Sequence, residues 1–165
     1  MGTIIIAQKV SQEVTKILQQ AGETVTIQEG NLEQLKAELP RASAILLGTW
    51  VKFNEELIQL APELLVISRT GVGVDNVDVD AATRRGILVL NTPEANAISV
   101  AEHTIALICG LSKYLVYLHG NVVRGNFQAR REYLPVDLDG KTLGLLGFGN
   151  IGRKVDKKAM AAFDM

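Results

Sequence analysis

The sequence predicts an α/β protein in which helices cover both faces of a parallel sheet. Short apolar runs of strand length alternate with segments of helical spacing from residue 3 to residue 90. Such alternation implies parallel strands joined by crossover helices. A glycine-rich turn then lies between an apolar run and a second helical segment, at residues 147–152. Hydrophobic residues make up 47% of the 165, which is enough to bury one or two small cores.

The first 90 residues are expected to supply five strands and four helices. The strands are predicted at residues 3–7, 24–27, 44–47, 64–67 and 87–90. The helices between them have recognisable N-caps, at Ser11, Asn31, Asn54 and either Asp78 or Asp80. Gly22, Pro40, Pro62 and Gly86 provide the corresponding stops.

The remaining residues predict a long helix, a connecting arm and one further strand and helix. The long helix is expected from Ser99 to His119, with Ser99 and Glu102 forming a capping box and Gly120 as the stop. Residues 121–139 are polar and irregular. We therefore predict a first domain over residues 1–97, and a crossover helix with one βα unit of a second domain over residues 98–165.

The turn at residues 147–152 has the pattern G-x-G-x-x-G of a dinucleotide-binding fingerprint. Gly147 allows a sharp turn, Gly149 allows the backbone to approach a pyrophosphate, and Gly152 allows close packing of helix on strand. The amides of Asn150 and Ile151 would open the helix, where an anion is favoured. A plain strand–turn–helix connection that binds nothing is the alternative. The acid expected about 20 residues further on would lie beyond residue 165.

A second glycine-containing loop follows the fourth strand, at residues 69–80. Its glycines could free the amides of Val72 and Gly73 to bind a small carboxylate. Ligands of open α/β sheets lie at the carboxyl ends of the strands, where this loop is expected. The alternative is an ordinary turn capped by Asp75 or Asp78, and the acids of this loop are read as caps rather than as metal ligands.

The segment at residues 91–103 contains one more candidate, Asn96. Its side chain could hydrogen-bond a substrate or cofactor, or it could bond its own backbone in a turn. His103 has no carboxylate or nucleophile assigned to it, so no acid–base role is predicted.

Composition excludes several classes of protein. The formal net charge is −1, without the basic surplus of a nucleic-acid groove. A single cysteine rules out a disulfide framework and fits the reducing cytoplasm. No signal peptide or membrane span is readable, because the apolar runs are short or interrupted by polar residues.

Two long stretches resemble the D-isomer-specific 2-hydroxyacid dehydrogenases, and within them the phosphoglycerate dehydrogenase branch. They read ISRTGVGVDNVDVDAATRRGILVLNTPEANAISVAEHTIALI and DLDGKTLGLLGFGNIGRKV. The similarity covers most of the chain and corresponds to the N-terminal portion of such an enzyme. It implies a flavodoxin-like, parallel-sheet substrate domain followed by the start of a Rossmann NAD-binding domain.

The resemblance also implies residue roles. The amides of Val72 and Gly73 would hold the substrate carboxylate and Asn96 would line the cleft. Val100 and the turn from Gly147 to Ile151 would contact NAD. The complete parent would be a homodimer that moves a hydride between NAD and C2 of a small 2-hydroxy or 2-keto acid.

The family's catalytic arginine, glutamate and histidine lie beyond the fingerprint helix, so no catalytic residue is expected within this chain. The alternative interpretation is a short non-enzymatic protein that senses NAD or oligomerises.

Overall fold

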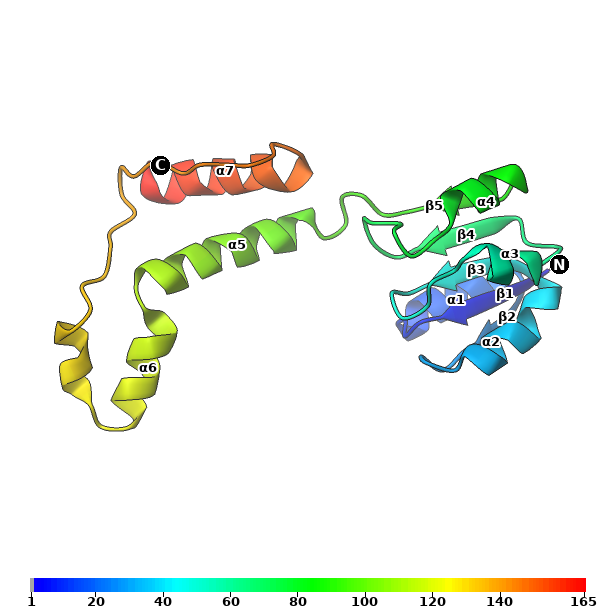
Figure 1. The fold of residues 1–165 in the computed structure, drawn as a ribbon, viewed down its shortest axis with the longest axis horizontal. Coiled ribbons are helices and arrows are strands. Elements are labelled where there is room, and N and C mark those ends of the chain that lie inside the picture. The colour runs from blue at the N-terminus through cyan, green and yellow to red at the C-terminus, as the bar shows by residue number, and fades with distance from the viewer. Residues whose placement is uncertain (1) are drawn as a thin grey trace. The chain divides into compact units, whose positions relative to one another are not determined.

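The computed structural model describes residues 2–165, which form two compact units divided between Pro93 and Glu94 (Figure 1). The expected boundary after residue 97 falls just inside a helix that begins at Ala97. Each unit has its own elements and is described separately.

The N-terminal unit contains a five-stranded, fully parallel sheet. Its strands are β1 Thr3–Ala7, β2 Glu23–Thr26, β3 Ala42–Leu47, β4 Val66–Arg69 and β5 Leu88–Leu90. They lie in the order β2-β1-β3-β4-β5, which is the flavodoxin-like doubly wound order. The predicted α/β class is therefore confirmed.

Four α-helices connect these strands, and each begins at a residue that the sequence marks as a cap. They are α1 Gln12–Ala21, α2 Leu32–Glu38, α3 Glu55–Gln59 and α4 Val79–Arg84, with a 3-10 turn at Leu39–Arg41. The side chains of Ser11, Asn31, Asn54 and Asp78 each accept a hydrogen bond from a first-turn amide. These bonds satisfy donors that the helix leaves unpaired. Of the two candidate caps for α4, Asp78 is the one used.

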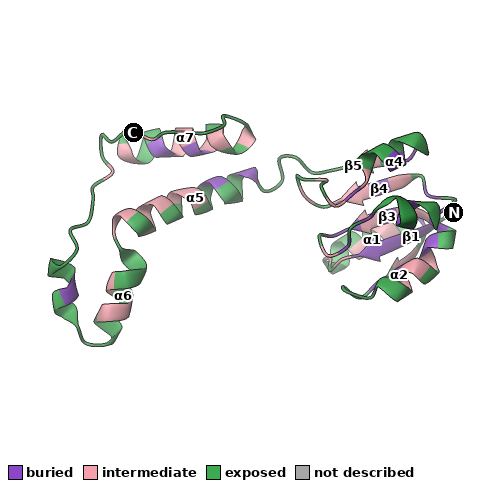
Figure 2. Cartoon of the chain, in the orientation of Figure 1, coloured by how far each residue is buried: buried purple, intermediate pink, exposed green. Residues whose placement is uncertain are grey.

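The core of the N-terminal unit lies between the sheet and its helices. Every residue of β1 is buried, as expected for a central strand of a parallel sheet. Phe53, Ile58 and Ile67 are completely buried within the same cluster. Buried residues are concentrated in this unit, whereas most of the C-terminal unit is half-buried or exposed (Figure 2).

The C-terminal unit is built from helices. Its elements are α5 Ala97–Ser112, α6 Leu115–Val123, a 3-10 turn at Phe127–Arg131, and α7 Asn150–Phe163. Helices α5 and α7 pack side by side (Figure 1) and bury Ala101, Val155 and Ala159. An ion pair between Lys158 and Glu102, at 3.1 Å, joins the two helices.

The prediction of one helix from Ser99 to His119 is wrong at both ends. The helix begins two residues earlier, so Ser99 lies in the first turn and caps nothing. It also breaks at Tyr114, whose φ of 49° is left-handed, and α6 continues after a bend of 60°. The arm contacts the end of α5, where the Val136 amide donates to the Ser112 carbonyl. Gly120, the expected stop, lies within α6.

An ion pair reinforces this attachment of the arm to the end of α5. Lys113 donates to the Asp137 carboxylate, and this hydrogen bond holds the pKa of Asp137 below its usual value. The ring of Tyr133 also packs against those of Tyr114 and Tyr117, with centroids 5.2 and 4.6 Å apart.

Among residues 2–165 no single helix is long and apolar enough to cross a membrane. Only α5 and α6 taken together, across their bend, match such a span in length and composition.

The expected strand at residues 143–146 is also wrong, because these residues pair with no strand and Leu146 lies in a bend. A strand requires a neighbour to take its N–H and C=O groups. Within the part of the chain that the structure describes, the C-terminal unit contains no strand that could pair with residues 143–146. Leu146 is accordingly fully exposed.

Candidate functional site

The loop that follows β4 presents two free backbone donors. Val72 and Gly73 are both exposed, and their amides donate to no acceptor within residues 2–165. The loop lies at the carboxyl end of the sheet, where ligands of this architecture bind. Adjacent backbone N–H groups without an acceptor can donate to an anion such as a small carboxylate.

Asn76 connects this loop to its surroundings. Its Nδ2 group donates to the carbonyl oxygens of Gly48, at 2.9 Å, and Val51, at 3.0 Å, beyond the end of β3. Its Oδ1 atom accepts from Nε of Arg69 at 3.3 Å, and its own carbonyl accepts from the Phe53 amide at 2.7 Å. Because this partly buried side chain is bonded through both Nδ2 and Oδ1, Asn76 fixes the loop relative to β4 and to the segment after β3.

Sequence reasoning missed this role, because nothing in the spacing of residues 69–80 distinguishes Asn76 from an ordinary loop residue. A single asparagine in a loop carries no signal of three tertiary hydrogen bonds. Its partners lie 7 to 28 residues away in the chain.

The other side of the loop is tied to the segment after β5. The Asn91 side chain donates to the Val72 carbonyl at 2.8 Å, and the Thr92 amide donates to the Gly71 carbonyl at 2.9 Å. The Gly71 and Val72 carbonyls are therefore bonded, whereas the Val72 and Gly73 amides have no acceptor among residues 2–165. This polarity favours an anion over a cation.

Gly73 provides space rather than an unusual backbone conformation. Neither Gly71 nor Gly73 has a positive φ. A Cβ added at Gly73 would lie 3.0 Å from Oδ2 of Asp75, whose side chain would have to shift.

Nearby Asp78 caps α4 through the Ala81 amide, at 2.9 Å. No cluster of three or more acids, histidines or cysteines suited to a metal occurs among residues 2–165.

The fingerprint turn lies in the C-terminal unit, immediately before α7. Gly147 has a φ of +96°, a conformation that favours glycine. Gly149 is the extended N-cap residue, and a Cβ added there would meet nothing within 4 Å. A Cβ at Gly152 would instead lie 2.7 Å from the carbonyl oxygen of Gly147. Gly152 was expected to allow packing on a strand, whereas here it allows the turn to close on itself.

Arg153 stabilises the same turn through hydrogen bonds. This role was not predicted from the sequence. Its guanidinium donates to the Phe148 carbonyl at 3.2 Å and to Oδ1 of Asn150 at 2.8 Å. Both acceptors belong to the turn or to the first residue of α7. The first amides of a helix, here those of Asn150 and Ile151, have no intrahelical acceptor and can face an anion.

The remaining candidates lie at the start of α5. Asn96 occupies the N-cap position, and its exposed side chain makes no hydrogen bond with the described residues. The alternative in which this side chain bonds its own backbone is therefore not observed. The Val100 amide donates to the Asn96 carbonyl at 2.9 Å, and its side chain is 36% exposed. Asn96, Val100 and the fingerprint turn thus share the C-terminal unit, whereas Val72 and Gly73 belong to the N-terminal unit.

Comparison with known proteins identifies the same family over nearly the whole chain. Residues 4–162 match the family described as D-isomer specific 2-hydroxyacid dehydrogenase, catalytic domain. D-3-phosphoglycerate dehydrogenase of Archaeoglobus fulgidus is 37% identical over 159 residues, covering 96% of this chain and 30% of that protein. The human D-3-phosphoglycerate dehydrogenase is 38% identical over 163 residues, covering 98% and 30%. The chain therefore spans about a third of the length of these relatives.

Solved structures support the same relationship. D-lactate dehydrogenase from Aquifex aeolicus, complexed with NAD and lactic acid, superposes with a TM-score of 0.80 at 31% identity, covering 96% of this chain and 48% of that one. A glyoxylate reductase from Paecilomyes thermophila gives a TM-score of 0.85 at 29% identity, covering 97% and 52%. The chain spans about half of each.

Proposed function

The chain belongs to the D-isomer-specific 2-hydroxyacid dehydrogenase family, and on that premise we propose that it forms part of an NAD-dependent oxidoreductase acting on a small D-2-hydroxy acid. In this proposal residues 1–97 are the substrate domain and residues 98–165 begin the NAD-binding domain. The observation that carries it is the pair of free, exposed amides at Val72 and Gly73, at the carboxyl end of a doubly wound sheet.

The substrate's carboxylate would accept hydrogen bonds from these two amides. Charge-assisted bonds of this kind are shorter and stronger than neutral ones, and two of them fix the orientation of a small acid. Orientation matters because hydride transfer requires C2 of the acid to face the cofactor. The nearby bonds of Asn76 and Asn91 would hold the amides in place as the ligand binds.

The fingerprint turn fits a dinucleotide. The open space at Gly149 would admit a pyrophosphate, and the amides of Asn150 and Ile151 would face it. Val100 and Gly152 would complete the cofactor contacts, and Asn96 would line the cleft. When bound, the nicotinamide would supply or accept the hydride. The choice of NAD is supported by the Aquifex aeolicus relative, whose complex contains it.

The acid–base and carbonyl-polarising groups are proposed to come from outside residues 1–165, because the family resemblance assigns them to positions beyond the fingerprint helix. We therefore expect the 165-residue polypeptide to form no NADH from D-3-phosphoglycerate or D-lactate, measured by absorbance against an enzyme-free blank. Turnover above that blank would contradict the assignment. If a longer natural form is equally inactive but binds NAD, the alternative of a non-enzymatic NAD sensor is favoured.

Replacing Gly73 by valine tests the carboxylate site in an active full-length form. The branched side chain would press on Asp75 and restrict the backbone that presents the amides. We expect the apparent KM for the acid to rise about tenfold, which corresponds to the loss of one charged hydrogen bond, with little change in KM for NADH. Val72→Ala is the matched control, because it keeps the amide. Equal effects of Gly73→Val on both KM values would exclude a carboxylate site here.

Association into a homodimer and a cytoplasmic location complete the proposal. Large apolar side chains are exposed on α5 and α6, including Leu111 at 76% and Val116 at 85%. An exposed apolar surface of this kind is typical of an interface. The single cysteine favours a reducing compartment.

A further inference from the structure

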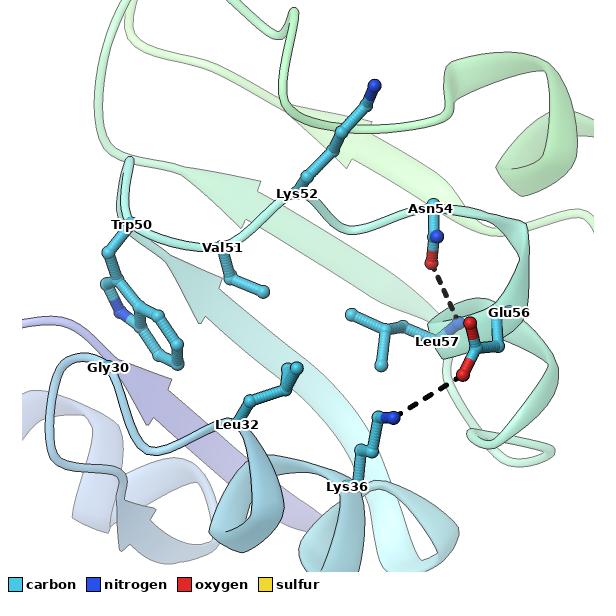
Figure 3. A pocket seen from close by; sticks show the side chains of 9 residues that line it. All are labelled: Gly30, Leu32, Lys36, Trp50, Val51, Lys52, Asn54, Glu56 and Leu57. Carbon is cyan, nitrogen blue, oxygen red and sulfur yellow. Dashed lines mark hydrogen bonds and ion pairs between the residues drawn. The ribbon is translucent and has the colours of Figure 1, made fainter.

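The N-terminal unit has a hollow between α2 and the segment after β3 that the proposed reaction does not use. It encloses about 390 Å³, within the range of small-molecule sites. Its lining consists of Gly30, Leu32, Lys36, Trp50, Val51, Lys52, Asn54, Glu56 and Leu57 (Figure 3).

The interior of this pocket is apolar and firmly held. Val51 and Leu57 are 5% and 4% exposed, and Leu32 faces them across the hollow (Figure 3). The Trp50 ring forms one wall, and its Nε1–H donates to the Ala7 carbonyl at 2.6 Å. This hydrogen bond fixes the plane of the indole. A fixed aromatic wall opposite aliphatic side chains accommodates a flat apolar group.

The rim of the pocket offers one positive charge. Nζ of Lys36 lies 3.4 Å from Oε1 of Glu56, and Glu56 is 67% exposed. An exposed ion pair is worth at most about 1 kcal/mol, so a competing anion can displace Glu56 at little cost. The Lys52 ammonium points away from the hollow (Figure 3). The Asn54 side chain is already bonded to the Leu57 amide at 3.2 Å.

We propose that this pocket binds a small planar aromatic molecule carrying one carboxylate. The ring lies against Trp50 and between Leu32 and Leu57, while the carboxylate takes the place of Glu56 on Lys36. The shape of the hollow selects the flat ring, and the single available cation selects the anionic group. The site is separate from the amides of the glycine loop and does not depend on the proposed reaction.

Trp50 is the only tryptophan in the chain, so its indole N–H gives a single signal in a proton–nitrogen correlation spectrum. Titration with benzoate is expected to shift that signal saturably. Benzyl alcohol has the same ring without the charge, and it should bind more weakly. Absence of a saturable shift with benzoate, or an equal affinity for benzyl alcohol, would overturn the proposal.

Three single substitutions locate the site. Lys36→Gln should weaken benzoate binding about fivefold, the equivalent of one exposed ion pair. Glu56→Gln should strengthen it, because Lys36 is then unpaired. Lys52→Gln removes a charge of the same sign that faces away from the hollow, and it should leave the affinity unchanged. An unchanged affinity in Lys36→Gln, or an equal loss in both lysine variants, would contradict binding at this pocket.

Discussion

Gly149→Val is expected to lower NAD affinity about a hundredfold, or ~2.7 kcal/mol, in the full-length protein that carries this sequence. The structure leaves the space beside Gly149 open, so the valine side chain would occupy the volume that the pyrophosphate requires. The protein itself has no atom there to clash with. The substitution should therefore remove ligand binding without unfolding the turn, which calorimetry and circular dichroism together can establish.

Gly152→Val is the matched comparison, since it changes the same turn for a different reason. Its Cβ would lie 2.7 Å from the Gly147 carbonyl, a backbone atom that cannot move without opening the turn. This variant should lose cofactor affinity and also lower the melting temperature, whereas Gly149→Val lowers affinity alone. Unchanged NAD affinity in Gly149→Val would reject the fingerprint as a nucleotide site.

Asn76→Ala is expected to cost about 2–3 kcal/mol of unfolding free energy in the N-terminal unit. The substitution leaves the Gly48 and Val51 carbonyls and the Arg69 guanidinium without their partner in a partly buried place. Urea denaturation measures the change. Asn91→Ala is a suitable control, because it removes one exposed hydrogen bond and should cost less than about 1 kcal/mol.

Asn76→Ala also tests whether this side chain contributes to binding of the acid as well as to stability. If Asn76 positions the amides of Val72 and Gly73, Asn76→Ala should also raise the KM for the acid at temperatures where the protein remains folded. Similar denaturation curves for Asn76→Ala and Asn91→Ala would show that the hydrogen bonds of Asn76 do not stabilise the loop.

Much of the N-terminal unit could be predicted from the sequence, because its signals are local. The caps Ser11, Asn31 and Asn54 act on amides three residues away, and the apolar run that forms β1 is buried along its whole length. Those features depend on spacing along the chain. They do not depend on contacts with residues that are distant in the sequence.

The C-terminal unit was predicted less well, because its features depend on distant partners. The break at Tyr114 accompanies contacts with the arm more than fifteen residues further on, and no local breaker marks it. The apolar run before Gly147 has strand composition, yet it forms no strand without a neighbour. The composition of a segment shows that it can form a strand, but the segment forms one only when a neighbouring strand pairs with it.

The candidate site divides in the same way. Val72 and Gly73 could be identified because glycines after a strand leave amides available. Asn76 and Arg153 could not, since their importance lies in bonds that only the folded chain reveals. The pocket around Trp50 is likewise assembled from segments after two different strands.

The order of the sheet also bears on how the chain is made. After β3 has paired with β1, each strand joins the one synthesised just before it, β4 on β3 and then β5 on β4. Ribosomes add about 5–20 residues per second, and domains generally fold from the N-terminus as they emerge. Because β5 ends at Leu90 and α5 begins at Ala97, no strand of this sheet waits for chain from the second unit. The loop proposed to bind the carboxylate can thus be complete on the ribosome before the fingerprint turn has been translated.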